Sequence, residues 1–270
     1  MSGRVDNKVA FITGAARGMG RNHAIRLAEE GADIIAVDIC ADIDAAPYGM
    51  ATAEDLAQTV KDIEALGRQV VARQADVRDA AALARAVGDG VDGLGRLDIV
   101  VANAGFGTVQ PWDAVTPEVW QTILDVNLTG TWNTVTAALP HVIAGGAGGS
   151  LVLISSSSGI KGHPFLTPYV ASKFGIVGIA KSLANELGRH HIRVNSVHPA
   201  GVDTPLLRGL GDMDALIELD PEVGSMFANT LPVPLVEAQD VSNAVVYLAS
   251  DESRYVTGTQ FKVDAGTTNR

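Results

Sequence analysis

Residues 8–20, Lys-Val-Ala-Phe-Ile-Thr-Gly-Ala-Ala-Arg-Gly-Met-Gly, decide the fold expected for this 270-residue chain. The run up to Thr13 is apolar without polar alternation, as in a strand buried on both faces of a parallel sheet. A glycine turn follows, and then apolar residues at helical spacing. Such a turn directs backbone N–H groups and the positive end of a helix dipole at one point, which suits a pyrophosphate. Its spacing differs from GxGxxG, so it predicts a dinucleotide site only in a supporting context. The candidate residues of the turn are Gly14, Arg17, Gly18, Met19 and Gly20.

The second apolar run, Ile34 to Val37, ends in Asp38. A carboxylate at the tip of the second strand can accept hydrogen bonds from the adenosine ribose and would repel a 2′-phosphate. Asp38 therefore favours NAD over NADP. The alternative is a solvated carboxylate at a strand end.

Residues 39–52 have no clear period and contain Pro47 and Gly49. They predict a loop that is longer than usual for such a connection. Because the loop leaves directly from Asp38, we expect it either to fold over the adenosine half of a cofactor or to be a surface insertion.

Further expected strands end in Asp76-Val77, in Asn103-Ala104-Gly105 and in the serine run 155–158. Ligands of open parallel sheets bind outside the carboxyl ends of the strands. Together with Gly14 and Asp38, five strand ends therefore point at one crevice. At its strand end, Asp76 could contact a purine edge or cap the next helix.

The bulk composition, 47% hydrophobic and 19% charged, predicts one α/β domain over residues 1–270, without repeats or a linker. A net charge of −11 with no Lys/Arg run argues against nucleic acid and anionic membranes as partners and leaves small molecules. The single cysteine, Cys40, and the lack of a signal pattern or membrane-length apolar run predict a cytoplasmic protein. The histidines are scattered without the spacing of metal ligands, so no metal site is predicted. The sequence has no Gly-x-Ser-x-Gly motif, which argues against a serine hydrolase.

Tyr169 and Lys173 lie four residues apart and share one face of an expected helix. A nearby ammonium favours the phenolate and would lower a tyrosine pKa that is otherwise about 10. This pair suits acid–base work on a bound redox cofactor, in which a serine holds the substrate oxygen and Tyr169 exchanges its proton during hydride transfer. Lys173 can also bind the nicotinamide ribose. Asn127 falls on the apolar face of a helix that starts near Thr116, and is either a structural bridge or a site residue that holds a water.

The motifs Thr13-Gly14-x3-Gly18-x-Gly20, Asn103-Ala104-Gly105, Asn127, Ser156 and Tyr169-x3-Lys173 occur in this order over nearly the whole chain. Together they closely resemble those of the short-chain dehydrogenase/reductase family. The resemblance implies a single Rossmann-like, doubly wound domain with a seven-stranded parallel sheet, and a homotetramer. It also implies a catalytic tetrad of Asn127, Ser156, Tyr169 and Lys173.

The same resemblance assigns Asp76 and Val77 to the adenine, Asn103 to the strand end beneath the cofactor, and Thr204 to the nicotinamide amide. Two positions depart from the family pattern: Ala102 replaces an asparagine, and Pro199-Ala200-Gly201 replaces Pro-Gly ahead of Thr204. The loop after Asp38 resembles that of a carveol-dehydrogenase-like and mycofactocin-associated subgroup, in which it is thought to cover NAD.

The expected function is NAD-dependent interconversion of a secondary alcohol and a ketone, with an apolar substrate that is terpenoid or alicyclic. Residues 202–234 lack firm periodicity and are expected to form a substrate lid. One alternative is an NADP-linked carbonyl or 3-oxoacyl-carrier reductase, which Asp38 disfavours. Another is a non-catalytic NAD-binding regulator, which the intact tetrad disfavours. The candidate pocket or lid residues, each of which could equally serve plain packing, are His163, Phe165, Met213 and Met226.

Overall fold

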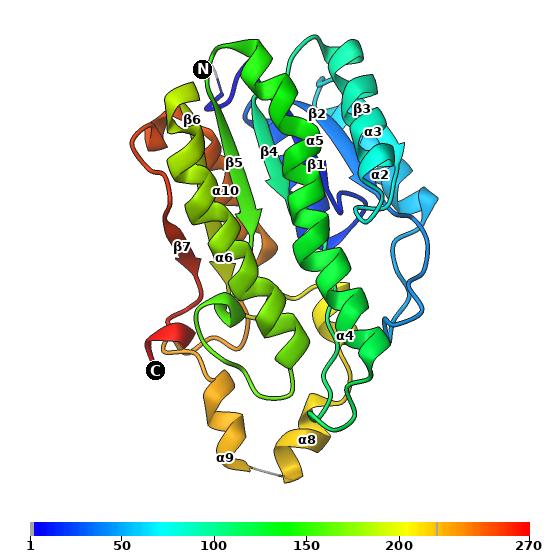
Figure 1. Cartoon of the computed structure of the whole chain (residues 1–270), viewed down its shortest axis with the longest axis vertical. Helices are drawn as coiled ribbons and strands as arrows, with labels where there is room; N and C mark the ends of the chain where they lie inside the picture. The colour runs from blue at the N-terminus through cyan, green and yellow to red at the C-terminus, as the bar shows by residue number, and fades with distance from the viewer. Residues whose placement is uncertain (1–2, 220) are drawn as a thin grey trace.

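Seven parallel strands form one sheet in the order β3-β2-β1-β4-β5-β6-β7 in the computed structural model of this chain (Figure 1). The structure describes residues 3–219 and 221–270. The predicted seven-stranded, doubly wound parallel sheet is therefore confirmed. The strands are β1 (Val9–Thr13), β2 (Asp33–Asp38), β3 (Val70–Gln74), β4 (Ile99–Ala102), β5 (Gly149–Ile154), β6 (Ile192–Pro199) and β7 (Gln260–Val263).

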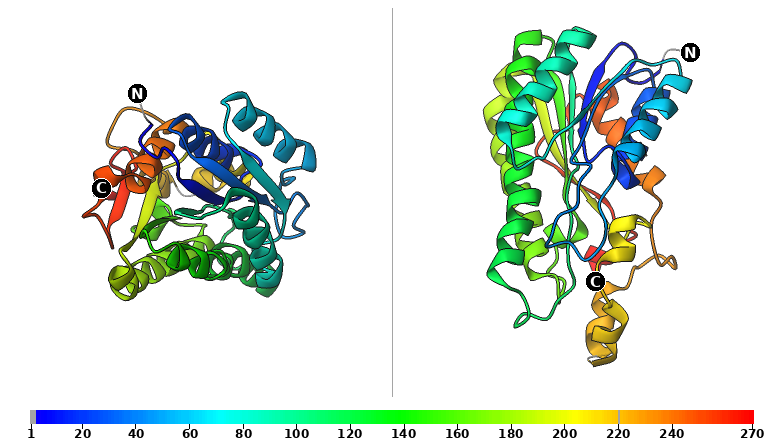
Figure 2. Two further views of the ribbon diagram at one scale, coloured as in Figure 1. Left: turned by 90° about the horizontal axis from the view of Figure 1, so that it is seen from above. Right: turned by 90° about the vertical axis from the view of Figure 1, so that its right-hand side faces the viewer.

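Helices cover both faces of the sheet and make three layers (Figure 2). One face packs against α3 (Ala80–Leu94), α5 (Gly130–Gly145) and α6 (Thr167–Leu187) through core residues such as Leu83, Val135 and Ile176. The other packs against α1 (Gly18–Glu29), α2 (Ala53–Ala65) and α10 (Ala238–Ala249). Because both faces are covered, the central strands β1 and β4 are apolar almost throughout, which is why continuous apolar runs predicted them.

Local signals in the sequence set several helix starts. Thr52 and Asp55 form a reciprocal capping box at the start of α2. Thr116 accepts a hydrogen bond from the Val119 N–H, with Pro117 as the first residue of α4 (Pro117–Leu124). A π-helical turn, Asp125–Thr129, then joins α4 to α5 and brings Asn127 into the core, where it is fully buried.

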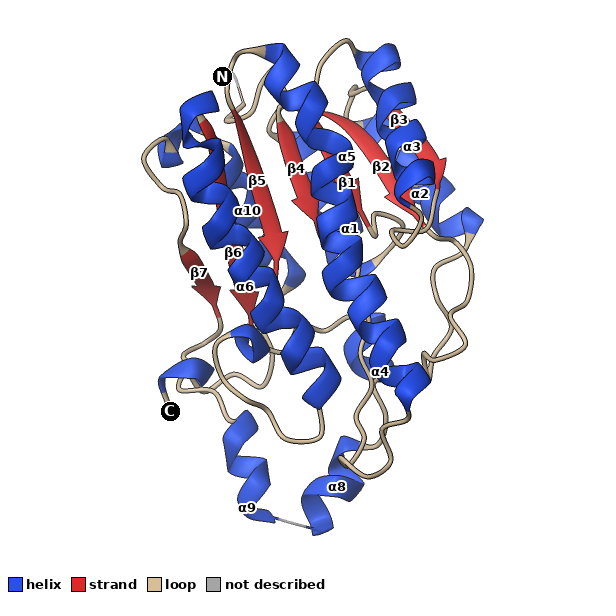
Figure 3. Ribbon diagram, viewed as in Figure 1, coloured by secondary structure: helices blue, strands red, loops and turns tan. Residues whose placement is uncertain are grey.

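The remaining segments gather beyond the carboxyl ends of the strands, at the lower end of Figure 3. They are the loop of residues 39–52 and the short helices α7 (Pro205–Gly209), α8 (Met213–Leu219) and α9 (Pro221–Gly224). They surround the sheet edge at which the sequence places its candidate site. Within the described residues, no helix has both the length and the apolar character that crossing a membrane would need.

Candidate active site

A cavity of about 440 Å³ opens at the carboxyl edge of the sheet. Residues from five strand ends line it, as the sequence predicted: Gly14, Asp38, Asp76, Asn103 and the serines 155–158. Its far wall is apolar and comes from α7 and α8, through side chains such as Leu207 and Ile217. The cavity therefore has a polar floor made by the sheet and an apolar cover made by the 205–219 segment.

The glycine turn has the backbone conformation that its sequence indicates. Gly14 and Gly18 have φ angles of 67° and 56°, in the region that favours glycine. A Cβ atom on Gly20 would lie 1.9 Å from the Gly14 carbonyl oxygen, so the first turn of α1 can approach β1 only with glycine there. Arg17 and Met19 also line the cavity, and among the described residues no side chain caps the start of α1. The N–H groups of this helix start are thus available to an anion.

Asp38 lies at the tip of β2 and is 7% exposed. Its Oδ2 accepts a hydrogen bond from the Ala16 N–H at 2.9 Å, and its Oδ1 accepts one from the Cys40 N–H at 3.2 Å. These bonds hold the carboxylate against the glycine turn, in the wall of the cavity. The side chain is therefore anchored, unlike a freely solvated carboxylate at a strand end.

Asp76 and Val77 line the cavity beyond β3. The Asp76 carboxylate pairs with the Arg78 guanidinium at 2.6 Å, whereas Asp79 accepts the Ala82 N–H at the start of α3. The interpretation of Asp76 as a helix cap is therefore wrong, because Asp79 is the cap.

Asn103 anchors the end of β4 to the glycine turn. Its Nδ2 donates to the Thr13 carbonyl oxygen at 3.0 Å, while its Oδ1 is buried without a hydrogen-bond partner in the described part of the chain. Ala104 and Gly105 continue the wall, and a Cβ atom on Gly105 would lie 3.1 Å from Asn127 Oδ1. A buried carbonyl oxygen without a partner beside a wall of small residues suits a bound ligand.

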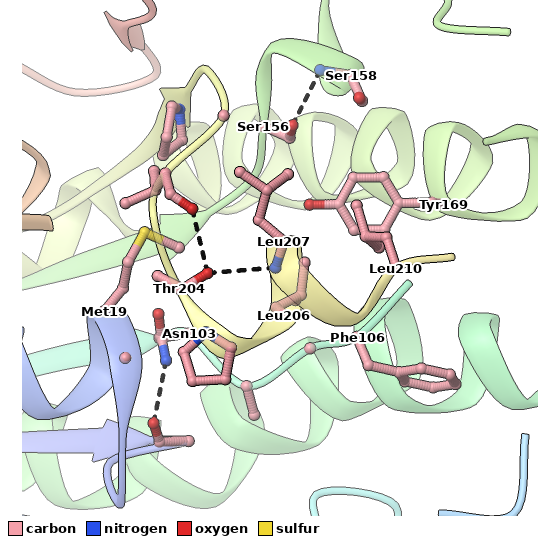
Figure 4. A pocket seen from close by; sticks show the side chains of 18 of the residues that line it. Met19, Asn103, Phe106, Ser156, Ser158, Tyr169, Thr204, Leu206, Leu207 and Leu210 are labelled. Atoms are coloured by element: carbon pink, nitrogen blue, oxygen red, sulfur yellow. Dashed lines mark hydrogen bonds between the residues drawn. The ribbon is translucent and has the colours of Figure 1, made fainter. Parts of the chain in front are cut away.

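Ser156 and Tyr169 direct their hydroxyl groups into the same part of the cavity, beside Leu207 (Figure 4). The Ser156 Oγ accepts a hydrogen bond from the Ser158 N–H at 3.1 Å, so its own proton stays available to a ligand. Lys173 lies behind Tyr169, with its Nζ 5.4 Å from the ring centroid and 3.0 Å from the Ile154 carbonyl oxygen. Three of the four predicted tetrad residues therefore meet at one place.

The pKa values of this pair are set mainly by burial. Burial raises the pKa of the Tyr169 phenol, and the Ser156 hydroxyl lowers it by a smaller amount. Burial lowers the pKa of the Lys173 ammonium to about 8. The net direction of the Tyr169 pKa in this structure is upward, because loss of water around the phenolate outweighs the Ser156 hydroxyl. The effect of Lys173 on this pKa stays a prediction.

Asn127 contributes through hydrogen bonds behind the cavity wall. Its Oδ1 accepts the Phe106 N–H at 3.0 Å, and its Nδ2 donates to the Phe106 carbonyl oxygen at 2.9 Å and to Ser172 Oγ at 3.1 Å. This geometry is that of the structural bridge, one of the two possibilities for Asn127. Asn127 thereby joins the segment that follows β4, at Phe106, to α6, the helix that carries Tyr169.

Ser155 and His198 hold the backbone around Lys173 and Ser156. The Ser155 Oγ donates to the Lys173 carbonyl oxygen at 2.9 Å. His198 Nδ1 lies 2.7 Å from the Ser156 carbonyl oxygen, so this nitrogen carries the proton, and Nε2 lies 2.8 Å from Ser196 Oγ. The sequence analysis missed His198, although its place at the end of β6 was a usable signal.

The 39–52 loop contributes Tyr48 and other residues to the cavity wall on the side of Asp38. Arg17 Nη2 donates to the Gly49 carbonyl oxygen at 2.7 Å. Tyr48 lines the cavity and packs against α7, where a Cβ atom on Gly209 would lie 2.4 Å from the Tyr48 Cγ. Burial raises the Tyr48 pKa to about 12. The sequence analysis missed this residue, although it is the only aromatic side chain in the loop.

The remaining predicted residues divide into two groups. Thr204 lies in the cavity wall and accepts the Leu207 N–H at 3.5 Å (Figure 4). His163 and Met213 also line the cavity, whereas Phe165 and Met226 do not. The Pro199-Ala200-Gly201 departure therefore does not move Thr204 away from the site. Among the described residues, no cluster of His, Cys, Asp and Glu is placed to hold a metal ion.

Several known proteins are similar to this chain in sequence and fold over nearly their whole length. A family model described as enoyl-(acyl carrier protein) reductase matches residues 14–268. The chain is 48% identical to the (−)-trans-carveol dehydrogenase of Rhodococcus erythropolis, covering 98% of this chain and 99% of that protein. The NAD-bound carveol dehydrogenase of Mycobacterium avium is 50% identical, with a TM-score of 0.93 over 99% of this chain and 100% of that one.

A short chain dehydrogenase from Mycobacterium paratuberculosis, bound to NAD, superposes with a TM-score of 0.96 at 50% identity. It covers 99% of this chain and 100% of that one. Likeness at this level over whole chains, together with the glycine turn, the serine and the tyrosine in one cavity and the lysine beside that tyrosine, places this protein in the short-chain dehydrogenase/reductase family.

Proposed function

We propose that this cavity holds NAD along its polar floor and a secondary alcohol or ketone beneath its apolar cover, with Tyr169 exchanging the proton. The observation that carries the proposal is the convergence of the Ser156 and Tyr169 hydroxyls on the cavity that also contains the glycine turn and Asp38. The family, with NAD-bound relatives that are 50% identical, supports the same reaction class. The protein is an NAD-dependent oxidoreductase that interconverts alcohols and ketones.

The residues present fit this cofactor. The start of α1 offers N–H groups to a pyrophosphate, and Asp38 offers carboxylate oxygens to a ribose. The Asn103 Oδ1 has no hydrogen-bond partner in the described chain and could bind the cofactor. Gly105 has no side chain, which leaves room for the cofactor near Lys173. Asp76, Val77, Ala104 and Thr204 complete the proposed cofactor wall. When bound, NAD supplies the hydride acceptor or donor.

Three side chains then handle the oxygen and its proton. Ser156 donates a hydrogen bond to the substrate oxygen, and Tyr169 takes or gives the proton. With its pKa raised by burial, Tyr169 is a phenol at neutral pH, the form that protonates a ketone. Lys173, a buried cation beside the ring, favours the phenolate that alcohol oxidation needs. Asn127 acts as a positioning residue, because it holds Phe106 in the cavity wall and Ser172 on the helix of Tyr169.

Removing the charge of Asp38 tests the cofactor preference. In Asp38→Asn we expect the ratio of kcat/KM for NADP over that for NAD to rise at least about tenfold, because a close negative charge no longer opposes a 2′-phosphate. Steady-state kinetics with both cofactors measures the ratio. Asparagine retains an oxygen that can accept from Ala16 or Cys40.

Asp44→Asn is the matched control, because Asp44 is an exposed carboxylate in the same loop. It removes the same charge from the protein without touching the strand end. If Asp44→Asn shifts the ratio as much as Asp38→Asn does, the net charge explains the preference and the ribose role of Asp38 is refuted.

We also propose that residues 39–52 cover the bound NAD and retard its release. The loop is tied to the glycine turn through Arg17 and Gly49, and to α7 through Tyr48 and Gly209. Protein loaded with NAD should keep it through gel filtration and release it in equal amount on denaturation. Tyr48→Ala should lose it faster, while Tyr255→Ala, at a side chain that is 90% exposed, should behave as wild type. Complete loss of NAD from wild type during filtration would contradict the cover.

The substrate that suits this cavity is apolar and alicyclic. Leu206, Leu207, Leu210, Met213 and Ile217 line its far wall, so a hydrocarbon ring would lose water on binding. The relative named as a carveol dehydrogenase supports this class. We assign residues 202–234 to the substrate lid on the basis of this lining; residue 220 lies outside the described residues.

We also propose a cytoplasmic homotetramer, and exposed aromatic side chains support its assembly. Trp132 on α5 and Phe174 on α6 are 46% and 44% exposed, on helices that cover the same face of the sheet. Large apolar side chains exposed in this way favour burial between subunits. A monomeric mass in solution would contradict the tetramer.

A further inference from the structure

His163 lies in the cavity wall between the serine loop and the lid. The residue lines the cavity and is 7% exposed. Its Nδ1 lies 2.9 Å from Ser158 Oγ, and its ring stacks on Phe227 of the lid with centroids 5.3 Å apart. No hydrogen-bond partner of Nε2 occurs among residues 3–219 and 221–270. Stacking on Phe227 accounts for the position of the imidazole ring, but it gives the Nε2 atom no hydrogen-bond partner.

The hydrogen bond to Ser158 decides which nitrogen carries the proton. Ser158 is buried, and within the described chain its Oγ has no hydrogen-bond partner other than His163. A buried hydroxyl hydrogen needs an acceptor, so Ser158 donates to Nδ1 and the imidazole proton resides on Nε2. Burial, with a smaller effect from Lys161, lowers the His163 pKa to about 4. At neutral pH the His163 imidazole is therefore uncharged, and its Nε2–H is available to donate a hydrogen bond.

The surroundings of His163 argue against a charged ligand. The Lys161 Nζ donates to the Met226 and Thr267 carbonyl oxygens, at 3.0 and 3.2 Å. Lys161 does not line the cavity, whereas Arg17 does, and Arg17 donates to Gly49 in the loop that leaves Asp38, toward the proposed cofactor end. A carboxylate beside the neutral imidazole would lose its water without a cation in the nearby cavity wall to pair with, because the Lys161 ammonium is held by two carbonyl oxygens outside that wall.

We propose that His163 is a specificity-determining residue that donates a hydrogen bond from Nε2 to a second, uncharged oxygen of the substrate. The inference rests on the proposed alcohol–ketone function and names its substrate class more closely. The preferred substrates are neutral alicyclic alcohols that carry another hydroxyl, carbonyl or ether oxygen. The Ser158 N–H also holds Ser156 Oγ, so one short loop positions both the reacting oxygen and the second one (Figure 4).

Paired alcohols that differ only in the second oxygen test this proposal. The probes are cyclohexanol and the cis and trans forms of cyclohexane-1,2-, 1,3- and 1,4-diol, each oxidised with NAD. Wild type should prefer at least one diol to cyclohexanol by about tenfold in kcat/KM, the value of one hydrogen bond. His163→Phe keeps a ring for Phe227 to stack on, and it should abolish that preference.

Ser158→Ala supplies a second variant that leaves the imidazole in place. It removes the bond that fixes the proton on Nε2, so the preference for the diol should fall by several-fold. His141→Phe, on α5 and outside the cavity, is the matched control and should keep the wild-type ratio. Melting temperatures show whether each variant is folded.

Each outcome separates a binding role from a packing role. A loss shared equally by cyclohexanol and the diols leaves the ratio unchanged, and it would show that His163 only packs against the lid. A wild-type enzyme that oxidises cyclohexanol without preferring any diol also overturns the proposal. Failure of wild type to oxidise any of these alcohols, or any others, would instead count against the proposed function.

Discussion

Tyr169→Phe should lower kcat by about a thousandfold, within the range found when a general acid–base is removed. Phenylalanine keeps the half-buried ring and removes only the hydroxyl that faces the cavity beside Ser156. NADH should still bind with wild-type affinity, because the glycine turn and Asp38 are untouched. Steady-state kinetics measures kcat, and fluorescence titration measures the binding of NADH.

Tyr255→Phe is the matched control for this loss, since Tyr255 is 90% exposed and far from the cavity lining. Its kcat should equal that of wild type. The wild-type enzyme should also oxidise alcohols faster as pH rises above neutrality, because the raised pKa of Tyr169 leaves little phenolate at pH 7. Turnover of Tyr169→Phe within a few-fold of wild type would rule out the proton-transfer role.

Gly20→Ala should weaken NADH binding by at least about a hundredfold, equivalent to about 2.7 kcal/mol. The added Cβ atom would lie 1.9 Å from the Gly14 carbonyl oxygen and 2.7 Å from Asn103 Nδ2. Backbone atoms cannot yield cheaply at this contact, so the glycine turn must move away from the start of α1. The change displaces the N–H groups proposed to hold the pyrophosphate. Titration with NADH measures the effect.

Gly88→Ala controls for the change of residue type, because Gly88 also lies in a helix and has open space around its Cα. Alanine favours a helix by about 1 kcal/mol over glycine, so this variant should melt at a higher temperature and bind NADH normally. Normal NADH binding by Gly20→Ala, with its fold intact, would show that the tight glycine turn is not needed for the cofactor.

The sheet and the polar floor of the site follow from local sequence patterns. Apolar runs such as Ile34 to Val37 predict doubly covered strands, and the residues after each run must then meet at one edge. Asn127 was recognised because a polar amide on an apolar stripe needs partners, which Phe106 and Ser172 provide. These inferences depend on the spacing of apolar residues and on the position of polar residues relative to them, and both can be seen in a single sequence.

The parts that escaped prediction depend on contacts between distant segments. Tyr48 and Gly209 meet across 161 positions of sequence (209 − 48), in segments without a helical or strand period. The helix cap at Asp79 and the bond from His198 to Ser156 likewise depend on the path of the backbone. The direction of the Tyr169 pKa could not be predicted either, because it depends on how fully the phenol is buried.

Transfer of isotope from substrate to cofactor tests the central claim most directly. Wild type and Tyr169→Phe are each incubated with excess NAD and carveol that carries deuterium on its carbinol carbon, and the nicotinamide is then analysed by mass spectrometry. The measurement works for a single turnover, so a retained cofactor does not hide it. We predict deuterated NADH and the ketone in equal amounts from wild type, and almost none from Tyr169→Phe. Ketone formed without deuterium in the nicotinamide, or equal labelling by the two proteins, would contradict hydride transfer assisted by Tyr169.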